Sequence, residues 1–247
     1  MIRMHLSKPL NRKILKEICL PTARIVGGKV YPNRRKRKNL KALILGSSEY
    51  LDPVNSLIRE GLTTKDNLIV FQRELNKQLR IETDGFNTLG GRAFESVMEN
   101  QDSELLNVFP FEIIYLDFPS QEPEPIEGRA ERELESIEYT ISTQVSKDSK
   151  CFGLIYTSII DSFGISPTEV FKSSSKKYVD GWYPKKFDGF GERCIEFNES
   201  VKLVDAALMV ISKKYGYTFT VVGQIRENLK NTEGAFVIGG YFTQGDI

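Results

Sequence analysis

The amino-acid sequence predicts a single α/β domain in which a mostly parallel seven-stranded sheet carries helices on both faces and ends in an antiparallel C-terminal hairpin. Three observations support this prediction. Short apolar runs alternate with stretches of helical periodicity along most of the chain. These runs are continuous rather than alternating with polar residues, which is typical of strands buried on both faces of a parallel sheet. The last two runs are separated by about twelve residues, too few for a covering helix, so they should pair antiparallel.

The N-terminal region is expected to contain a short helix over residues 11–18 that stops before Pro21. Gly27 and Gly28 then break the chain. Residues 41–45 form the first apolar run, which ends at Gly46 and predicts a buried strand. The elements expected to follow are a helix over 52–60, a strand over 68–71, and a short strand and then a helix within 86–100.

The second half of the chain continues the alternation. Residues 111–116 predict a strand that ends at Asp117, and a Pro- and Glu-rich loop follows it. An amphipathic pattern predicts a long helix over 129–146. The remaining expected elements are a strand over 152–156, an irregular insertion over 162–198, a helix over 199–215 and strands over 217–222 and 235–242. We therefore expect one α/β domain over residues 41–247.

The composition limits the chemistry that is available to the chain. His5 is the only histidine, and the cysteines Cys19, Cys151 and Cys194 lie far apart. These features argue against a Ser-His-Asp triad, a Cys-His dyad, a zinc site built on histidines and a disulfide framework. No apolar stretch approaches the roughly 20 residues that span a bilayer, and the N-terminus lacks the apolar core of a secretory signal. We expect a cytoplasmic protein with no membrane partner, whose chemistry depends on carboxylates, backbone groups, Lys and Arg, or a cofactor.

Charge is distributed unevenly along the chain. Residues 1–41 hold six arginines and seven lysines against one acid, Glu17, for a net charge of +12. Because the whole chain carries +1, residues 42–247 carry −11. Residues 1–40 are expected to form a basic arm that attracts the phosphate backbone of RNA or DNA, with the charge peaking at Arg34, Arg35 and Arg37. The alternative is a solvated terminus that docks on the acidic remainder of the chain.

Four segments at the expected strand ends carry characteristic residues. They read LILGSSEY over 43–50, FQRE over 71–74, LGGRAF over 89–94 and FEIIYLDFPS over 111–120. Taken in order, they resemble the motif series of the class I S-adenosylmethionine-dependent methyltransferases, with a fourth motif like that of nucleic-acid N-methyltransferases. The resemblance covers about residues 41–247. It implies a Rossmann-like methyltransferase fold and S-adenosylmethionine as cofactor.

The resemblance also implies roles for particular residues. Glu74 corresponds to the acid that binds the ribose hydroxyls, whereas a surface salt bridge is its alternative role. Asp117 and the carbonyl of Phe118 would accept the hydrogens of a substrate amine, and Pro119 would hold the turn. In the alternative interpretation, Asp117 caps the following loop and Phe118 belongs to the core. The residues implied in cofactor binding are Gly46, Ser47, Ser48, Glu49, Glu74, Arg92 and Ala93.

The sequence also departs from the family pattern. Ser48 and Tyr50 replace two glycines of the first turn, Arg92 stands where an acid is common, and Ser120 replaces an aromatic residue. The insertion interleaves cations with aromatics, and Trp182, Tyr183 and Lys185 are candidates for stacking on bases and contacting phosphates. Alternatively, its aromatics form the core of an ordered loop.

The function indicated by these features is methyl transfer from S-adenosylmethionine to a base nitrogen of nucleic acid. The alternatives are a non-catalytic protein of this fold that binds nucleic acid or an acidic partner, and a methyltransferase for a small molecule.

Overall fold

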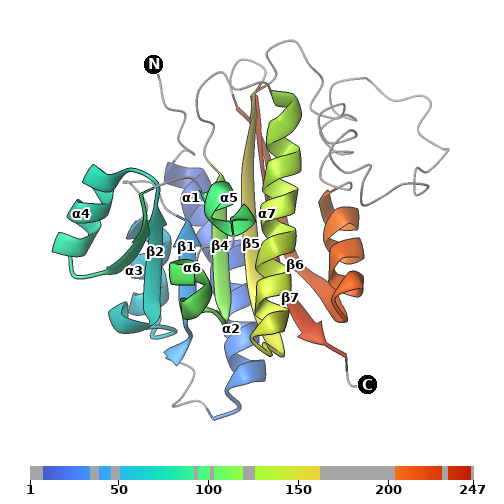
Figure 1. The fold of residues 1–247 in the computed structure, drawn as a ribbon, viewed down its shortest axis with the longest axis horizontal. Coiled ribbons are helices and arrows are strands. Elements are labelled where there is room, and N and C mark those ends of the chain that lie inside the picture. The colour runs from blue at the N-terminus through green and yellow to red at the C-terminus, as the bar shows by residue number, and fades with distance from the viewer. Residues whose placement is uncertain are drawn as a thin grey trace.

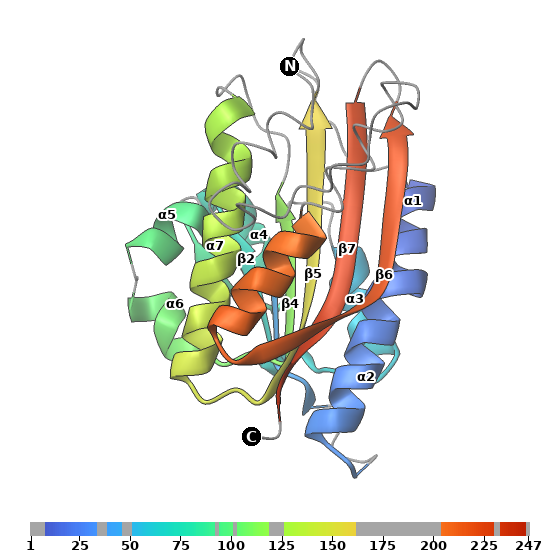
Figure 2. The same cartoon turned by 90° about the vertical axis from the view of Figure 1, so that its right-hand side faces the viewer.

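A computed structural model describes residues 8–33, 39–45, 51–91, 94–100, 103–118, 126–161, 204–229 and 233–245. These residues form a central sheet with a layer of helices on each face (Figures 1 and 2). The predicted Pro- and Glu-rich loop over 119–125 and the insertion over 162–198 lie outside the described residues.

The sheet has seven strands in the order β3-β2-β1-β4-β5-β7-β6. Strands β1 to β5 are parallel to one another, and β7 pairs antiparallel with both β5 and β6. This confirms the predicted mostly parallel sheet with an antiparallel C-terminal hairpin. The strands are β1 (Ala42–Leu45), β2 (Leu68–Gln72), β3 (Asn87–Gly90), β4 (Ile113–Phe118), β5 (Cys151–Asp161), β6 (Tyr217–Leu229) and β7 (Glu233–Gln244).

The helices divide between the two faces of the sheet, and each layer buries its own apolar cluster. One layer contains α1 (Lys8–Ile14), the π-helical turn η1 (Leu15–Cys19), α2 (Leu20–Val30), α3 (Leu51–Arg59) and α4 (Leu75–Thr83). The other contains α5 (Phe94–Glu99), α6 (Ser103–Val108), α7 (Ile126–Ser146) and a helix over 204–214. A short 3-10 turn, η3 (Lys65–Asn67), precedes β2.

The N-terminal helix differs from its prediction, because helical structure runs without a break over residues 8–30. Pro21 lies in the first turn of α2, directly after η1, where the Leu20 amide donates to the Leu15 carbonyl across the wider π-type turn. Such a turn shifts the hydrogen-bond ladder, and this allows a helix to pass a proline that has no N–H to donate. Gly27 lies inside α2 with Leu40 packed against it. Within the predicted arm over 1–40, residues 8–30 are therefore part of the packed domain.

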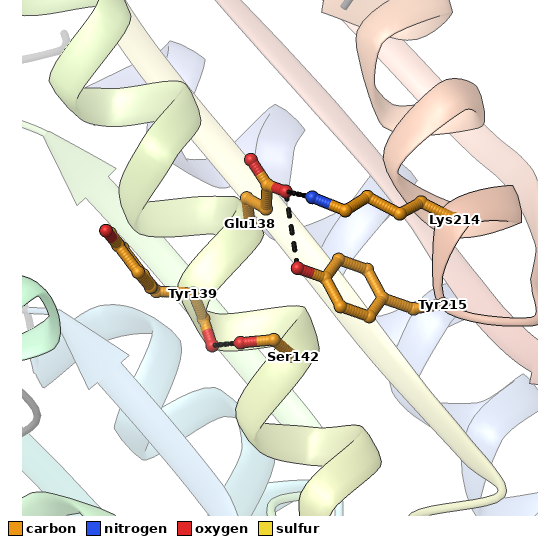
Figure 3. A network of polar contacts seen from close by, with 5 residues as sticks. All are labelled: Glu138, Tyr139, Ser142, Lys214 and Tyr215. Carbon is orange, nitrogen blue, oxygen red and sulfur yellow. Dashed lines mark hydrogen bonds and ion pairs between the residues drawn. The ribbon is translucent and has the colours of Figure 1, made fainter.

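On the opposite face, polar contacts join α7 to the helix over 204–214 (Figure 3). The carboxylate of Glu138 accepts hydrogen bonds from the Lys214 ammonium at 2.5 Å and from the Tyr215 hydroxyl at 3.2 Å. In the same view, the Ser142 hydroxyl donates to the Tyr139 carbonyl at 2.8 Å within α7. The contacts of Glu138 hold the last helix of the domain against α7.

The C-terminal hairpin is longer than predicted. Strand β6 continues to Leu229 and β7 begins at Glu233, so both strands extend into the residues expected to connect them. The two strands pair along their whole length, with an irregularity between Val221 and Gly223. Backbone pairing along a partner strand extends a strand beyond its apolar residues, which explains the difference.

Candidate functional site

The sheet reverses its strand order beside β1. From β1 the chain proceeds to β2 and β3 on one side, and it later adds β4 and β5 on the other. The switch point therefore lies between β1 and β4. In open α/β sheets, ligands bind at such a switch point, beyond the carboxyl ends of the parallel strands. We call the edge at which β1 to β5 end the carboxyl edge.

Asp117 and Phe118 are the last two residues of β4, at this carboxyl edge. Their side chains point to opposite faces of the sheet, because successive residues of a strand alternate. Phe118 is 2% exposed and packs edge-to-face with Phe94 and Tyr156, so its side chain belongs to the core. Asp117 is 7% exposed and lies on the face that carries α1, η1 and α2.

The side chain of Asp117 is buried among polar groups. Burial raises the pKa of the Cys19 thiol above its ordinary value, and the nearby negative charge of Asp117 raises this pKa further. On β5, Thr157 is the register partner of Asp117 and is fully buried. The Thr157 hydroxyl has no hydrogen-bond partner in the part of the chain that the structure describes. A buried hydroxyl therefore lies beside the carboxylate that the sequence singled out, and the Cys19 thiol is close enough for the charge of Asp117 to affect its pKa.

At the end of β2, Gln72 shapes the turn into α4. The Gln72 side-chain oxygen accepts a hydrogen bond from the Glu74 amide at 3.1 Å. Leu45 of β1 is in register with Phe71 of β2 and with Leu116 of β4. Gln72 and Asp117 are the residues that directly follow these two partners. Both side chains consequently face the same side of the sheet, about 10 Å apart across β1.

Glu74 lies at the N-terminus of α4, with its side chain 37% exposed. Its carboxylate forms an ion pair with the Lys77 ammonium at 2.6 Å. The surface salt bridge considered as the alternative role of Glu74 is thus present. The carboxylate still lies at the carboxyl edge, where it can accept hydrogen bonds from hydroxyl groups.

The end of β3 leaves no room for a side chain. A Cβ atom on Gly90 would lie 1.8 Å from the Gln72 carbonyl oxygen, and the φ of Gly90 is +147°. The Gly91 amide donates to the same carbonyl at 3.0 Å. Glycine at position 90 therefore brings the backbone of β3 close to the end of β2, and bare backbone is exposed at this edge.

A second buried acid lies on the α7 side of the carboxyl edge. Glu133 of α7 is 1% exposed, and its Oε2 atom accepts hydrogen bonds from the Tyr156 hydroxyl and, at 3.0 Å, from the Ser158 hydroxyl. Ser158 is the register partner of Phe118. The sequence prediction missed Glu133 because an acid in an amphipathic helix is normally assigned to its solvent face.

The remaining predicted site residues lie outside the described residues: Gly46, Ser47, Ser48, Glu49, Arg92, Ala93, Pro119, Arg34, Arg35, Arg37, Trp182, Tyr183 and Lys185. Within the residues that are described, no group of three or more His, Cys, Asp or Glu side chains could hold a metal ion. Of the helices in that same part of the chain, none has the length and apolarity to cross a membrane.

The sheet order and the residues at its carboxyl edge define a Rossmann-like α/β protein with acids at the ends of β2 and β4. Among solved structures, the chain is similar to M. jannaschii TYW2 in complex with AdoMet, with 11% identity over 89% of this chain and 77% of that chain and a TM-score of 0.41. A similarity of this size assigns neither a family nor an activity. No protein-family model matches the chain, and no curated protein is significantly similar to it in sequence.

Proposed function

We propose that the chain is an S-adenosylmethionine-dependent methyltransferase that acts on a base nitrogen of nucleic acid. The observation that carries this proposal is the position of Asp117. It lies at the carboxyl end of β4, on the strand next to β1 where the strand order reverses. This is the place at which a doubly wound sheet binds its ligand.

The described residues at this edge are compatible with an adenosyl cofactor. Glu74 offers carboxylate oxygens that accept hydroxyl hydrogens, and Gly90 and Gly91 expose backbone that a ligand can approach closely. In the proposal, these residues act together with residues of the segments 43–50 and 89–94. The cofactor would supply an electrophilic methyl group, which is chemistry that side chains do not provide. The proposed additional contacts are Gly46, Ser47, Ser48, Glu49, Arg92 and Ala93.

In this proposal, Asp117 orients the nucleophile. A carboxylate accepts hydrogen bonds only, so it can hold the hydrogens of an exocyclic amine and fix the direction of the nitrogen lone pair. The carbonyl of Phe118 would accept the second hydrogen, and Pro119 would fix the turn that follows. Holding the amine in this way contributes to the rate by positioning, without a covalent intermediate on the protein.

The nucleic-acid substrate is proposed on charge. The net charge of +12 over residues 1–41 would attract a phosphate backbone. In the proposal, Arg34, Arg35 and Arg37 contact phosphates, while Trp182, Tyr183 and Lys185 contact unpaired bases.

The test is transfer of a labelled methyl group from S-adenosylmethionine to RNA or DNA by the purified protein. We expect Asp117→Ala to abolish transfer while the cofactor affinity stays near that of the wild type. Asp66→Ala is the matched control, because Asp66 is an exposed acid in η3, at the opposite edge of the sheet. Undiminished transfer by Asp117→Ala would exclude Asp117 as the orienting group.

A second function is favoured by the burial of Asp117, which is only 7% exposed and lies near Cys19. In this alternative, the chain keeps the fold as a non-catalytic protein that binds nucleic acid or an acidic partner. The two functions differ in whether the protein binds S-adenosylmethionine.

A further inference from the structure

The outward face of the first helix carries three cations. In α1 and η1, the side chains of Leu10, Ile14, Leu15 and Ile18 are buried. Most of the side chains between them are exposed, and they include Arg12, Lys13 and Lys16. We call these three residues the α1–η1 basic stripe. Positions 12 and 16, and 13 and 16, are neighbours on a helix surface, so the three charges lie side by side.

Four other described cations form ion pairs within the domain. Ion pairs join Arg24 to Glu60, Lys77 to Glu74, Lys150 to Asp148 and Lys214 to Glu138. By contrast, within the described residues, neither an ion pair nor a side-chain hydrogen bond involves any member of the α1–η1 basic stripe. Its charges are therefore available to an external anion.

The three like charges of the stripe lie close together on one helix. Residues 8–30 form one run of helix, and Arg12, Lys13 and Lys16 lie beyond its first turn, where the helix dipole has little effect on charges. The first turn of α1 holds no acid, and Glu17 follows only in η1. Like charges three and four residues apart also repel one another. A cluster of three positive charges attracts an anionic partner such as a phosphate backbone.

The stripe is also held rigidly. Ile18 lies directly over the bare backbone of β7 and β6, with Cγ2 2.0 Å from the Cβ position of Gly239 and Cγ1 3.2 Å from that of Gly223. Thr22 covers Gly153 of β5 in the same way, at 2.6 Å. Because the helix is already packed on the sheet, its cations can bind a ligand without first ordering the backbone.

The stripe lies at the same end of the sheet as Asp117. The hydroxyl of Tyr31, after α2, donates to Glu112, just before β4, whereas Cys19 of η1 lies near Asp117 at the end of β4. The helix thus runs antiparallel to β4, and α1 lies toward the end of the sheet at which β5 terminates (Figure 2). Arg12 precedes Cys19 by seven residues, which places it about 10 Å further along the helix axis in that direction.

We propose that the α1–η1 basic stripe is a preformed contact surface for the phosphate backbone of a nucleic acid, positioned so that the bound strand passes the carboxyl edge near Asp117. The class of partner rests on the proposed function. The surface itself rests on the exposure, rigidity and lack of internal pairing of the three cations.

The test compares two triple charge reversals. The first is R12E/K13E/K16E, and the control is R80E/K147E/K213E, which changes the net charge equally. Arg80, Lys147 and Lys213 are exposed cations on three separate segments. Each segment leads into the amino end of a strand, which places these three cations away from the carboxyl edge. Binding to a labelled single-stranded RNA and to a duplex DNA is measured by fluorescence anisotropy over a range of salt concentrations.

We expect the stripe variant to lose about tenfold or more in affinity. The slope of log affinity against log salt should fall by about two units for the single strand and about three for the duplex, as three lost phosphate contacts would produce. The control should bind within about twofold of the wild type, because its cations lie outside the contact surface. The neutral variant R12Q/K13Q/K16Q should show a smaller loss in the same direction. Its folding should be intact, since it only removes repulsion between like charges.

Equal losses in both triple variants would overturn the proposal, as would wild-type affinity in the stripe variant. Binding of the wild type to vesicles with anionic lipid, without binding to either nucleic acid, would also overturn it. Titration with S-adenosylmethionine in parallel separates this proposal from the proposed function. If the protein binds S-adenosylmethionine but the stripe variant binds nucleic acid as the wild type does, only the proposal of the contact surface is overturned. If only the stripe variant loses nucleic-acid affinity and the protein does not bind S-adenosylmethionine, the contact surface is supported and the methyltransferase function is contradicted.

Discussion

Ile18 occupies the space that a side chain on Gly239 would need, because its Cγ2 atom lies 2.0 Å from the Cβ position of that glycine. The two residues are far apart in the sequence, yet their contact fixes η1 against β7. Ile18 is fully buried, and its β-branched side chain has little rotational freedom in a helix. The N-terminal helix is therefore an integral layer of the domain.

Gly239→Ala tests this contact. We expect it to lower the free energy of unfolding by about 1–3 kcal/mol, because the added methyl group overpacks a closed core. The measurement is denaturant unfolding followed by circular dichroism. Gly28→Ala is the control: it adds the same methyl group to α2 in open space, where it should stabilise the helix by about 0.5–1 kcal/mol. Equal effects of the two substitutions would show that the Ile18 contact is not tight.

Gly90→Ala should disturb the carboxyl edge of β2. Its Cβ would meet the Gln72 carbonyl at 1.8 Å, so β3 must move away or the φ of +147° must change. We expect a loss of about 2 kcal/mol or more in stability, together with weaker cofactor binding if the proposed function holds. Gly91→Ala, which has a positive φ but open space around it, should cost only about 1–2 kcal/mol. A Gly90→Ala protein as stable as Gly91→Ala would contradict the close approach.

Tyr156→Phe should weaken the core beneath Phe118. The substitution removes a hydroxyl that donates to the buried carboxylate of Glu133, and hydrogen bonds to charged groups contribute about 1.5–3 kcal/mol. Thermal or denaturant unfolding measures the loss. Tyr139→Phe, on the same face of the sheet but exposed on α7, should change stability by less than about 0.5 kcal/mol. A loss that small for Tyr156→Phe would show that Glu133 does not depend on this hydroxyl.

The stability of the domain should depend on pH through Glu112. Burial raises the pKa of this carboxyl above its ordinary value of 4.5, although its hydrogen bonds from the Lys41 amide and the Tyr31 hydroxyl act in the opposite direction. Since the folded pKa is the higher one, the folded state holds its proton longer, and stability is lost as the pH rises from the unfolded to the folded pKa. Unfolding free energies of the wild type should therefore fall relative to those of Glu112→Gln across this window. A relative rise with pH would contradict the sign.

Much of the sheet could be predicted from the sequence because strands buried on both faces appear as continuous apolar runs. Leu43 and Ile44 illustrate this, since one faces each core cluster. The extent of the strands was less predictable. Thr157 and Ser158 lie beyond the apolar run of β5 but still pair with β4, because the partner strand supplies their backbone hydrogen bonds.

The helix through Pro21 and the surroundings of Asp117 could not be predicted for a different reason. Pro21 normally ends a helix, and only the wider turn η1 and packing on the sheet allow the helix to continue. The sequence correctly places Asp117 at the end of a strand, but its neighbour Cys19 lies in another layer of the fold. No local pattern encodes this proximity, since it depends on how the first helix packs on the sheet.

Calorimetric titration of the purified chain with S-adenosylmethionine tests the proposed enzyme most directly. The account predicts saturable binding of one cofactor per chain, which is weakened in Gly90→Ala and retained in Asp117→Ala. An absence of binding heat at high protein concentration, confirmed by an unchanged melting temperature in excess cofactor, would contradict it and leave the non-catalytic function.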